Sequence, residues 1–149
     1  MFLFAALLAV SATPAEQAAI FTAAGFKKSR GAWRTDCDQP NAGSYQPGAI
    51  ETYRDLNGDG RLEAVVTEGS TYCYGNTGTG FRLLSKQPSG RWAVLYETQG
   101  IAEFLPARGA NRMPDISIGG PGFCFLVIRW SGKACVKNRF EYEGKPCKR

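Results

Sequence analysis

The chain has 149 residues, 44% of them hydrophobic, which suits one domain with a core of ordinary size. A formal charge of +5 favours anionic partners, and the absence of histidine excludes histidine-based hydrolases and Cys/His zinc sites. Eighteen glycines, eight prolines and many aromatic residues favour turn-rich β structure. We therefore expect a mainly β (α+β) fold: a small antiparallel β-sheet meander domain with one N-terminal helix, stapled by disulfides.

The N-terminus resembles an export signal. Residues 2–10 are apolar, and Val10-Ser11-Ala12 suits signal peptidase cleavage after Ala12. The usual preceding basic residues are missing, which leaves two explanations: a start site placed too late, or a membrane-buried helix. Nine apolar residues cannot span a bilayer, which favours the first. We expect a signal peptide at 1–12, a single domain at 13–149 without a transmembrane segment, and a periplasmic or secreted location.

A helix is predicted directly after the signal. Thr13 is suited to the N-cap, Pro14 to the first helical position, and Glu16 to reaching back as the second half of a capping box. The helix should run to about Ala24, with Gly25 as its stop.

Short alternating segments then predict strands joined by tight turns. Pro88-Ser89-Gly90 and Ser131-Gly132 lie at hairpin distance between apolar runs, so antiparallel pairing is the default. The expected strands are residues 33–37, 49–54, 62–68, 71–74, 81–86, 92–97, 115–118, 123–130 and 134–140.

A faint internal repeat relates 63–97 to 115–140. In each, an acidic residue opens a strand, and a glycine, a cysteine, a second strand, a Ser-Gly turn and a third strand follow. Two equivalent three-stranded units side by side would place Cys73 near Cys124, and Cys37 would then pair with Cys147 and leave Cys135 as the odd thiol. The similarity of any two β meanders is the competing explanation, and other connectivities stay open.

The segment Asp55-Leu56-Asn57-Gly58-Asp59-Gly60-Arg61-Leu62-Glu63 carries the clearest chemistry. Its Asp-x-Asn-x-Asp-Gly pattern offers Ca²⁺ three side-chain ligands and the Arg61 carbonyl, with Gly60 making the bend. An EF-hand is excluded because Val66 replaces the bidentate glutamate and the flanks read as β. The alternative is a metal-free hairpin in which Asp55 and Asn57 cap their own backbone, although like charges would then face each other.

Residues 55–66 resemble the calcium-loop hairpin of FG-GAP/VCBS-type repeats, the units of integrin-like β-propellers. The resemblance implies calcium ligands at Asp55, Asn57, Asp59, the Arg61 carbonyl and Glu63. That last position is usually Asp in the family, and the longer Glu63 side chain would reach the ion through a water. The match covers about a dozen residues, and one loop does not make a propeller. The segments 68–75, 119–125 and 141–147 are similar to uncharacterised exported proteins of Gram-negative bacteria, which implies no activity.

Two further functions compete with a calcium-stabilised module. A carboxylate-dependent carbohydrate-active enzyme needs only two acids, which could come from Glu97, Glu103, Asp115 or Glu141, although surface carboxylates are the simpler reading. A polyanion-binding envelope protein would use the basic cluster around Trp33, made of Lys27, Lys28, Arg30 and Arg34, or the basic tail, made of Lys145, Lys148 and Arg149. The simpler reading packs Trp33 inward and leaves the cations solvated.

From these observations we expect an exported, calcium-stabilised β domain that is not an enzyme and acts as a binding or structural module of the periplasm or cell surface. Its partner would be an anionic envelope polymer or glycan. Export makes nucleic acid an improbable partner.

Overall fold

The computed structural model describes residues 10–41 and 43–149. They form a mainly β fold of antiparallel sheets with an N-terminal helix, and disulfides link Cys37 to Cys73 and Cys124 to Cys147, which confirms the predicted fold class. Most of the predicted signal peptide, 1–12, lies outside the described residues. Within the described ranges, no helix is long and apolar enough to cross a membrane.

The helices are short and the strands make up most of the chain. Helix α1 spans Pro14–Ala23 and α2 spans Thr71–Tyr74, and the 3-10 turns η1 and η2 span Gly75–Thr77 and Ala110–Arg112. The strands are β1 Lys27–Ser29, β2 Ala32–Arg34, β3 Gln46–Arg54, β4 Glu63–Gly69, β5 Thr79–Lys86, β6 Trp92–Gln99, β7 Ile101–Arg108, β8 Pro114–Gly119, β9 Phe125–Trp130, β10 Cys135–Tyr142 and β11 Lys145–Pro146.

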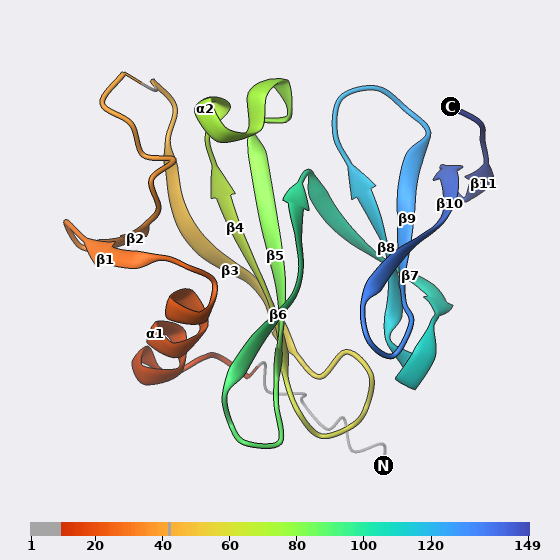
Figure 1. Ribbon diagram of the computed structural model, residues 1–149, viewed down its shortest axis with the longest axis horizontal. Coiled ribbons are helices and arrows are strands. Elements are labelled where there is room, and N and C mark those ends of the chain that lie inside the picture. The colour runs from red at the N-terminus through yellow and green to blue at the C-terminus, as the bar shows by residue number, and fades with distance from the viewer. Residues whose placement is uncertain (1–9, 42) are drawn as a thin grey trace, which may run out of the picture.

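Two antiparallel meanders follow each other along the chain (Figure 1). The first sheet has the order β3-β4-β5-β6, the second has the order β11-β10-β9-β8-β7, and β1 and β2 form a separate hairpin. The segments compared as a repeat supply β4 to β6 and β8 to β10, and each unit gains a strand in front, β3 or β7. The first unit therefore forms a four-stranded sheet, and the second forms a five-stranded sheet because β11 pairs beside β10. Neither β7 nor β11 was predicted from the sequence.

The first sheet is covered on both faces. On one face, Ala64, Val66 and Leu84 pack with Ile20 and Phe21 of α1. On the other, Val65, Phe81 and Leu83 form a second cluster with residues of the second sheet, among them Ile116 and Ile128. Three layers result, α1 with its hairpin, the first sheet and the second sheet, and this explains why β4 is buried almost throughout.

Helix α1 begins as predicted but lacks the capping box. The Thr13 hydroxyl accepts a hydrogen bond from the Glu16 backbone N–H at 3.2 Å. The Glu16 carboxylate does not close the box; it accepts from Lys86 Nζ at 2.7 Å and from Trp92 Nε1 at 3.2 Å. The Thr13 cap is therefore kept, while contacts of Glu16 with the first sheet replace its half of the capping box and fasten the helix to β5 and β6.

One predicted strand was wrong, and three observed strands, β1, β7 and β11, were not predicted. Residues 71–74 form helix α2, because the Ser70 hydroxyl accepts from the Cys73 N–H at 3.1 Å and caps a helical turn. Strand β7 was missed because Pro106 interrupts its pattern, yet β7 lies at an edge of the second sheet, where proline is tolerated.

The disulfide pairing predicted from the repeat was also wrong. Cys73 lies on α2, and this helix folds toward the loop before β3. Cys73 therefore forms its disulfide with Cys37 rather than with Cys124. Cys124 pairs with Cys147, which follows the short strand β11. Each bond thus belongs to one sheet, and Cys135 is free, as expected.

Candidate functional site

Residues 55–63, the acidic loop, connect β3 to the start of β4. Gly58 and Gly60 have φ of 76° and 84°, which glycine adopts without strain. Asp55 Oδ1 accepts from the Gly58 N–H at 2.8 Å, and Oδ2 accepts from the Gly60 N–H at 2.8 Å. Burial favours the protonated acid, but hydrogen bonds from the backbone outweigh burial and lower the pKa of Asp55, so this carboxylate is ionised.

The next two polar side chains also bind loop backbone. Asn57 Oδ1 accepts from the Asp59 N–H at 3.3 Å, and Asp59 Oδ1 accepts from the Arg61 N–H at 2.8 Å. The Arg61 guanidinium lies 3.1 Å from Asp59 Oδ2 at the exposed side of the loop. Only the backbone carbonyl of Arg61 was predicted to take part in the site, so the contact between its guanidinium and Asp59 was not predicted.

Glu63 lies at the base of the loop and is fully buried. Its Oε2 accepts from the Leu56 N–H at 2.9 Å, and its Oε1 lies 3.5 Å from the Ser85 hydroxyl. No cationic side chain among the described residues pairs with this carboxylate. Burial, together with the negative charges of Asp59 and Asp55, raises the pKa of Glu63 to about 7. Among the predicted ligands, Asp59 is paired with Arg61, whereas the buried Glu63 carboxylate has no cationic partner among the described residues.

The acidic loop has the donor chemistry that Ca²⁺ prefers, because every side chain predicted to ligate offers oxygen. Within residues 10–41 and 43–149, no three Asp, Glu, Cys or His side chains already converge closely enough to form a metal cluster. A cation would have to draw the carboxylates of Asp55, Asp59 and Glu63 together. The hydrogen bonds from loop backbone are those expected of the metal-free hairpin, and they leave further lone pairs on the Asp55 and Asp59 carboxylates.

The acidic loop is also a joint between the two sheets. Leu56 is 6% exposed and packs in the cluster that contains Phe81 of the first sheet and Ile116 of the second. Arg108, at the end of β7, donates through Nη1 to the Leu56 carbonyl at 3.0 Å and to the Arg112 carbonyl at 2.7 Å. One guanidinium thus fastens the acidic loop to the turn that connects β7 and β8.

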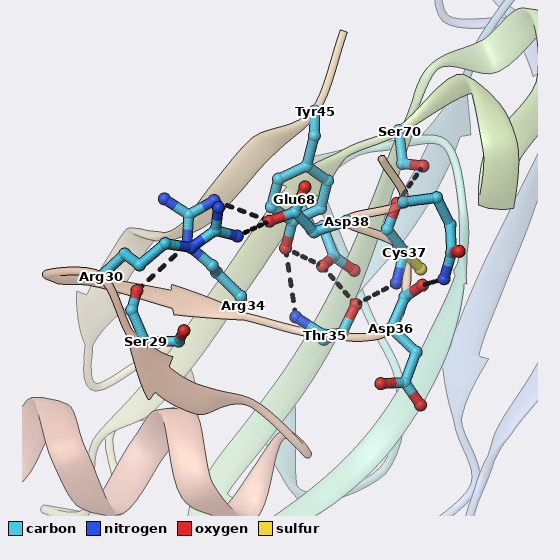
Figure 2. A network of polar contacts seen from close by, with 11 residues as sticks. Ser29, Arg30, Arg34, Thr35, Asp36, Cys37, Asp38, Tyr45, Glu68 and Ser70 are labelled. Carbon is cyan, nitrogen blue, oxygen red and sulfur yellow. Dashed lines mark hydrogen bonds and ion pairs between the residues drawn. The ribbon is translucent and has the colours of Figure 1, made fainter. Parts of the chain in front are cut away.

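A second polar cluster surrounds Glu68 and was not predicted (Figure 2). Glu68 Oε2 accepts from the hydroxyls of Thr35 and Tyr45, both at 2.5 Å, and Oε1 accepts from Tyr74 at 2.8 Å. Arg82 Nη1 lies 3.6 Å from the same carboxylate. Burial and the Glu68 hydrogen bond raise the pKa of Tyr45 and of Tyr74 to about 12, so both phenols remain donors.

This Glu68 cluster holds the structure together around the first disulfide. It fastens the loop before β3 and helix α2 to β4, and the Ser70 hydroxyl adds a hydrogen bond to the Cys37 carbonyl at 3.2 Å (Figure 2). The alternation of residues along β4 could have predicted a buried acid here, because it places Glu68 on the same face as Ala64 and Val66, which is buried. Its hydrogen-bond donors could not be predicted in this way, because they come from other segments of the chain.

Several side chains of the basic cluster around Trp33 already contact neighbouring residues of the protein. The Trp33 ring stacks on Phe21 with centroids 5.1 Å apart. Arg30 and Arg34 each bind Asp38 Oδ2 at 2.8 Å (Figure 2). Trp33 therefore packs against the helix, and one acid compensates two of the four cations.

The acids considered for an enzyme have different environments. Asp115 is fully buried and binds Arg129 and Arg139, and Glu141 binds Arg139 as well. Glu97 and Glu103 are exposed, and Glu97 lies 3.3 Å from Arg82. Asp115 and Glu141 thus share a guanidinium, which fits a structural ion-pair network.

Comparison with known proteins gives no relative: no family model, no curated protein and no solved structure matches this chain.

Proposed function

We propose that the chain is an exported, calcium-stabilised β domain that acts as a non-enzymatic binding or structural module of the periplasm or cell surface. One observation carries the calcium part: Glu63 is fully buried, the charges of Asp55 and Asp59 act on it, and no cationic side chain of the described residues pairs with it. A buried carboxylate with like charges beside it is costly, and a bound divalent cation removes that cost.

The strand pairing adds support. Ser85 stands opposite Glu63 in the β4–β5 ladder. The neighbouring strand therefore offers a neutral hydroxyl at the position where a lysine or arginine would have neutralised the carboxylate. When bound, Ca²⁺ would be held by Asp55, Asn57, Asp59, the Arg61 carbonyl and Glu63, and would supply positive charge and a fixed loop shape. Because Leu56 fills the core between the sheets, a stiffer acidic loop stabilises their packing.

The export part rests on the sequence at 1–12 and is compatible with the two disulfides, which persist in oxidising compartments. The non-enzymatic part draws support from the arginines that occupy Asp115, the most deeply buried of the acids considered for catalysis.

Thermal unfolding of the whole chain with Ca²⁺ and with EGTA tests the calcium proposal. Calcium at about a hundred times its Kd should raise Tm by roughly 5–10 °C, because it binds only the folded state. The variant Asp59→Ala should lose this rise. Asp36→Ala removes an exposed acid elsewhere in the chain and should keep it. A wild-type Tm that is the same in calcium and in EGTA would reject the proposal.

A further inference from the structure

A cavity of about 670 Å³ lies beside the acidic loop, between the ends of the two sheets. Its walls come from four connections: the acidic loop, the β5–β6 hairpin, the η2 turn (residues 109–113) and the β9–β10 hairpin. The acidic loop and the β9–β10 hairpin lie at the same end of the molecule, in the lower part of Figure 1. Ligand sites prefer such places, where loops meet at a junction of two packed layers.

Positive charge is in excess in this cavity. Arg61, Arg112 and Lys133 line it, and Asp59, which pairs with Arg61, is the acid among its lining residues. Within the described residues, Arg112 and Lys133 form no ion pair. The cavity of about 710 Å³ beside the Trp33 cluster differs, because Asp38 already binds Arg30 and Arg34 there. Arg112 and Lys133 are therefore available to bind an anionic ligand in this cavity.

The remaining walls suit a sugar ring. Asn57, Gln87 and Asn111 present side-chain amides, which both donate and accept, as neighbouring hydroxyl groups require. The Asn57 side chain uses its oxygen within the acidic loop, and within the described residues its amide nitrogen has no acceptor. Trp130 adds an aromatic ring at the cavity wall.

The η2 turn holds two of these side chains in a strained backbone. Asn111 and Arg112 have φ of 55° and 61°, a left-handed conformation that is unfavourable for a long side chain such as that of arginine. Arg108 fixes the turn by binding the Arg112 carbonyl. Such strain persists where the surrounding structure enforces it, and it gathers at binding sites.

We propose that this cavity binds a carboxylated sugar, with Arg112 and Lys133 contacting the carboxylate, the amides contacting hydroxyl groups and Trp130 contacting a ring face. The inference deepens the proposed function, because it names the ligand class of the binding module and uses the acidic loop as one wall. A calcium-stiffened loop would hold Asn57 ready for the ligand, which lowers the entropy lost on binding.

Digalacturonate is the probe, titrated into the whole chain in calcium and followed by calorimetry and by the Trp130 indole N–H signal in NMR. Binding should be saturable and at least about tenfold tighter than that of the neutral disaccharide galactobiose, since a charged contact contributes about this factor. The double variant Arg112→Gln/Lys133→Gln should lose about tenfold in affinity. Lys145→Gln/Lys148→Gln, which removes two positive charges outside the cavity, is the matched control and should bind as the wild type does.

Several results would overturn the inference: no binding at millimolar probe, equal affinity for galactobiose, or inorganic phosphate that displaces the sugar at equal concentration. Unchanged affinity in the double variant, with a wild-type Tm, would also overturn it. Tm measured in calcium and EGTA separates the two proposals. A calcium-dependent Tm without sugar binding rejects the cavity alone, and sugar binding with a calcium-independent Tm rejects the calcium proposal alone.

Discussion

Glu63 and Asp115 occupy comparable places in the two sheets and have opposite surroundings. Both are fully buried, Glu63 at the first position of β4 and Asp115 at the second position of β8. Arg129 Nε and Nη2 each donate to Asp115 at 2.9 Å, and Arg139 donates at 2.7 Å. These arginines outweigh the effect of burial and lower the pKa of Asp115, whereas burial and neighbouring acids raise that of Glu63 to about 7.

Strand pairing locates the difference at one position of the neighbouring strand. Ser85 stands opposite Glu63, while Arg129 lies one residue beyond the Ile116–Ile128 pair and reaches Asp115. The second sheet therefore supplies a counter-charge to Asp115, and the first sheet supplies none to Glu63. The comparison teaches that burial of an acid demands positive charge: arginines supply it to Asp115, and under the proposed function calcium would supply it to Glu63.

Asp115→Asn should have the largest effect. It removes the charge that holds Arg129 and Arg139, leaves Arg129 without an acidic partner among the described residues and leaves Arg139 with Glu141 alone, which should cost about 3 kcal/mol of unfolding free energy. Because its folded pKa is lowered, Asp115 contributes stability above its ordinary pKa of 3.8, and this is lost as the pH falls through the folded value. Urea unfolding at neutral pH measures the loss, with exposed Glu143→Gln as the control. A loss no larger than that of the control would contradict the contrast.

Glu63→Gln should act in the opposite direction. Without calcium, the folded state binds more protons than the unfolded state between the ordinary pKa of 4.5 and about 7, so stability falls as the pH rises through this window. The loss by pH 8 should be on the order of 2 kcal/mol. Gln removes the pH dependence, so the variant should be the more stable protein in EGTA at pH 8 and should ignore calcium.

Urea unfolding at pH 5, 6, 7 and 8, in EGTA and in calcium, measures this effect. Glu103→Gln, an exposed neutralisation on β7, is the matched control and should keep the wild-type profile. A wild-type stability in EGTA that does not change over this range would show that Glu63 is not penalised in the folded state.

The smallest effect compares the connections that precede β4 and β8. The first bends at Gly60, with φ of 84°, and the second at Asn111, with φ of 55°. Gly60→Ala should lower the free energy of unfolding by about 1 kcal/mol, because alanine is less suited than glycine to the left-handed region. Asn111→Gly should raise it by about a few tenths of a kcal/mol, because glycine is better suited to that region than asparagine. Thermal unfolding of both variants in EGTA measures the pair. Effects of the same sign would contradict the explanation.

Local patterns carried most of the fold. Alternation predicted the meanders, and Thr13 and Pro14 marked the start of α1. The failures came where distant contacts decide: 71–74 became helical beside the disulfide to Cys37, and β7 tolerates Pro106 because it lies at a sheet edge. Disulfide pairing was wrong for the same reason, since it depends on how α2 folds over its own sheet.

The candidate site divides in the same way. The spacing of Asp55, Asn57 and Asp59 is a local pattern and is legible in the sequence, and calcium at this loop stays a prediction. The hydrogen bond from Arg108 to the loop and the contact of Ser85 with Glu63 come from residues far along the chain, so no local pattern indicates them. The cavity beside Trp130 likewise needs four separate connections to meet.

The arrangement of the disulfides has a consequence for how the protein matures. Cys37 and Cys73 are separated by 36 residues, and both precede Cys124 in the chain. As the polypeptide emerges N-terminus first, the first bond can close before the later three cysteines appear, and Cys124 then finds Cys147 with only Cys135 as a competitor. Vectorial synthesis thus reduces the fifteen ways of forming two bonds among five thiols to a short, ordered sequence.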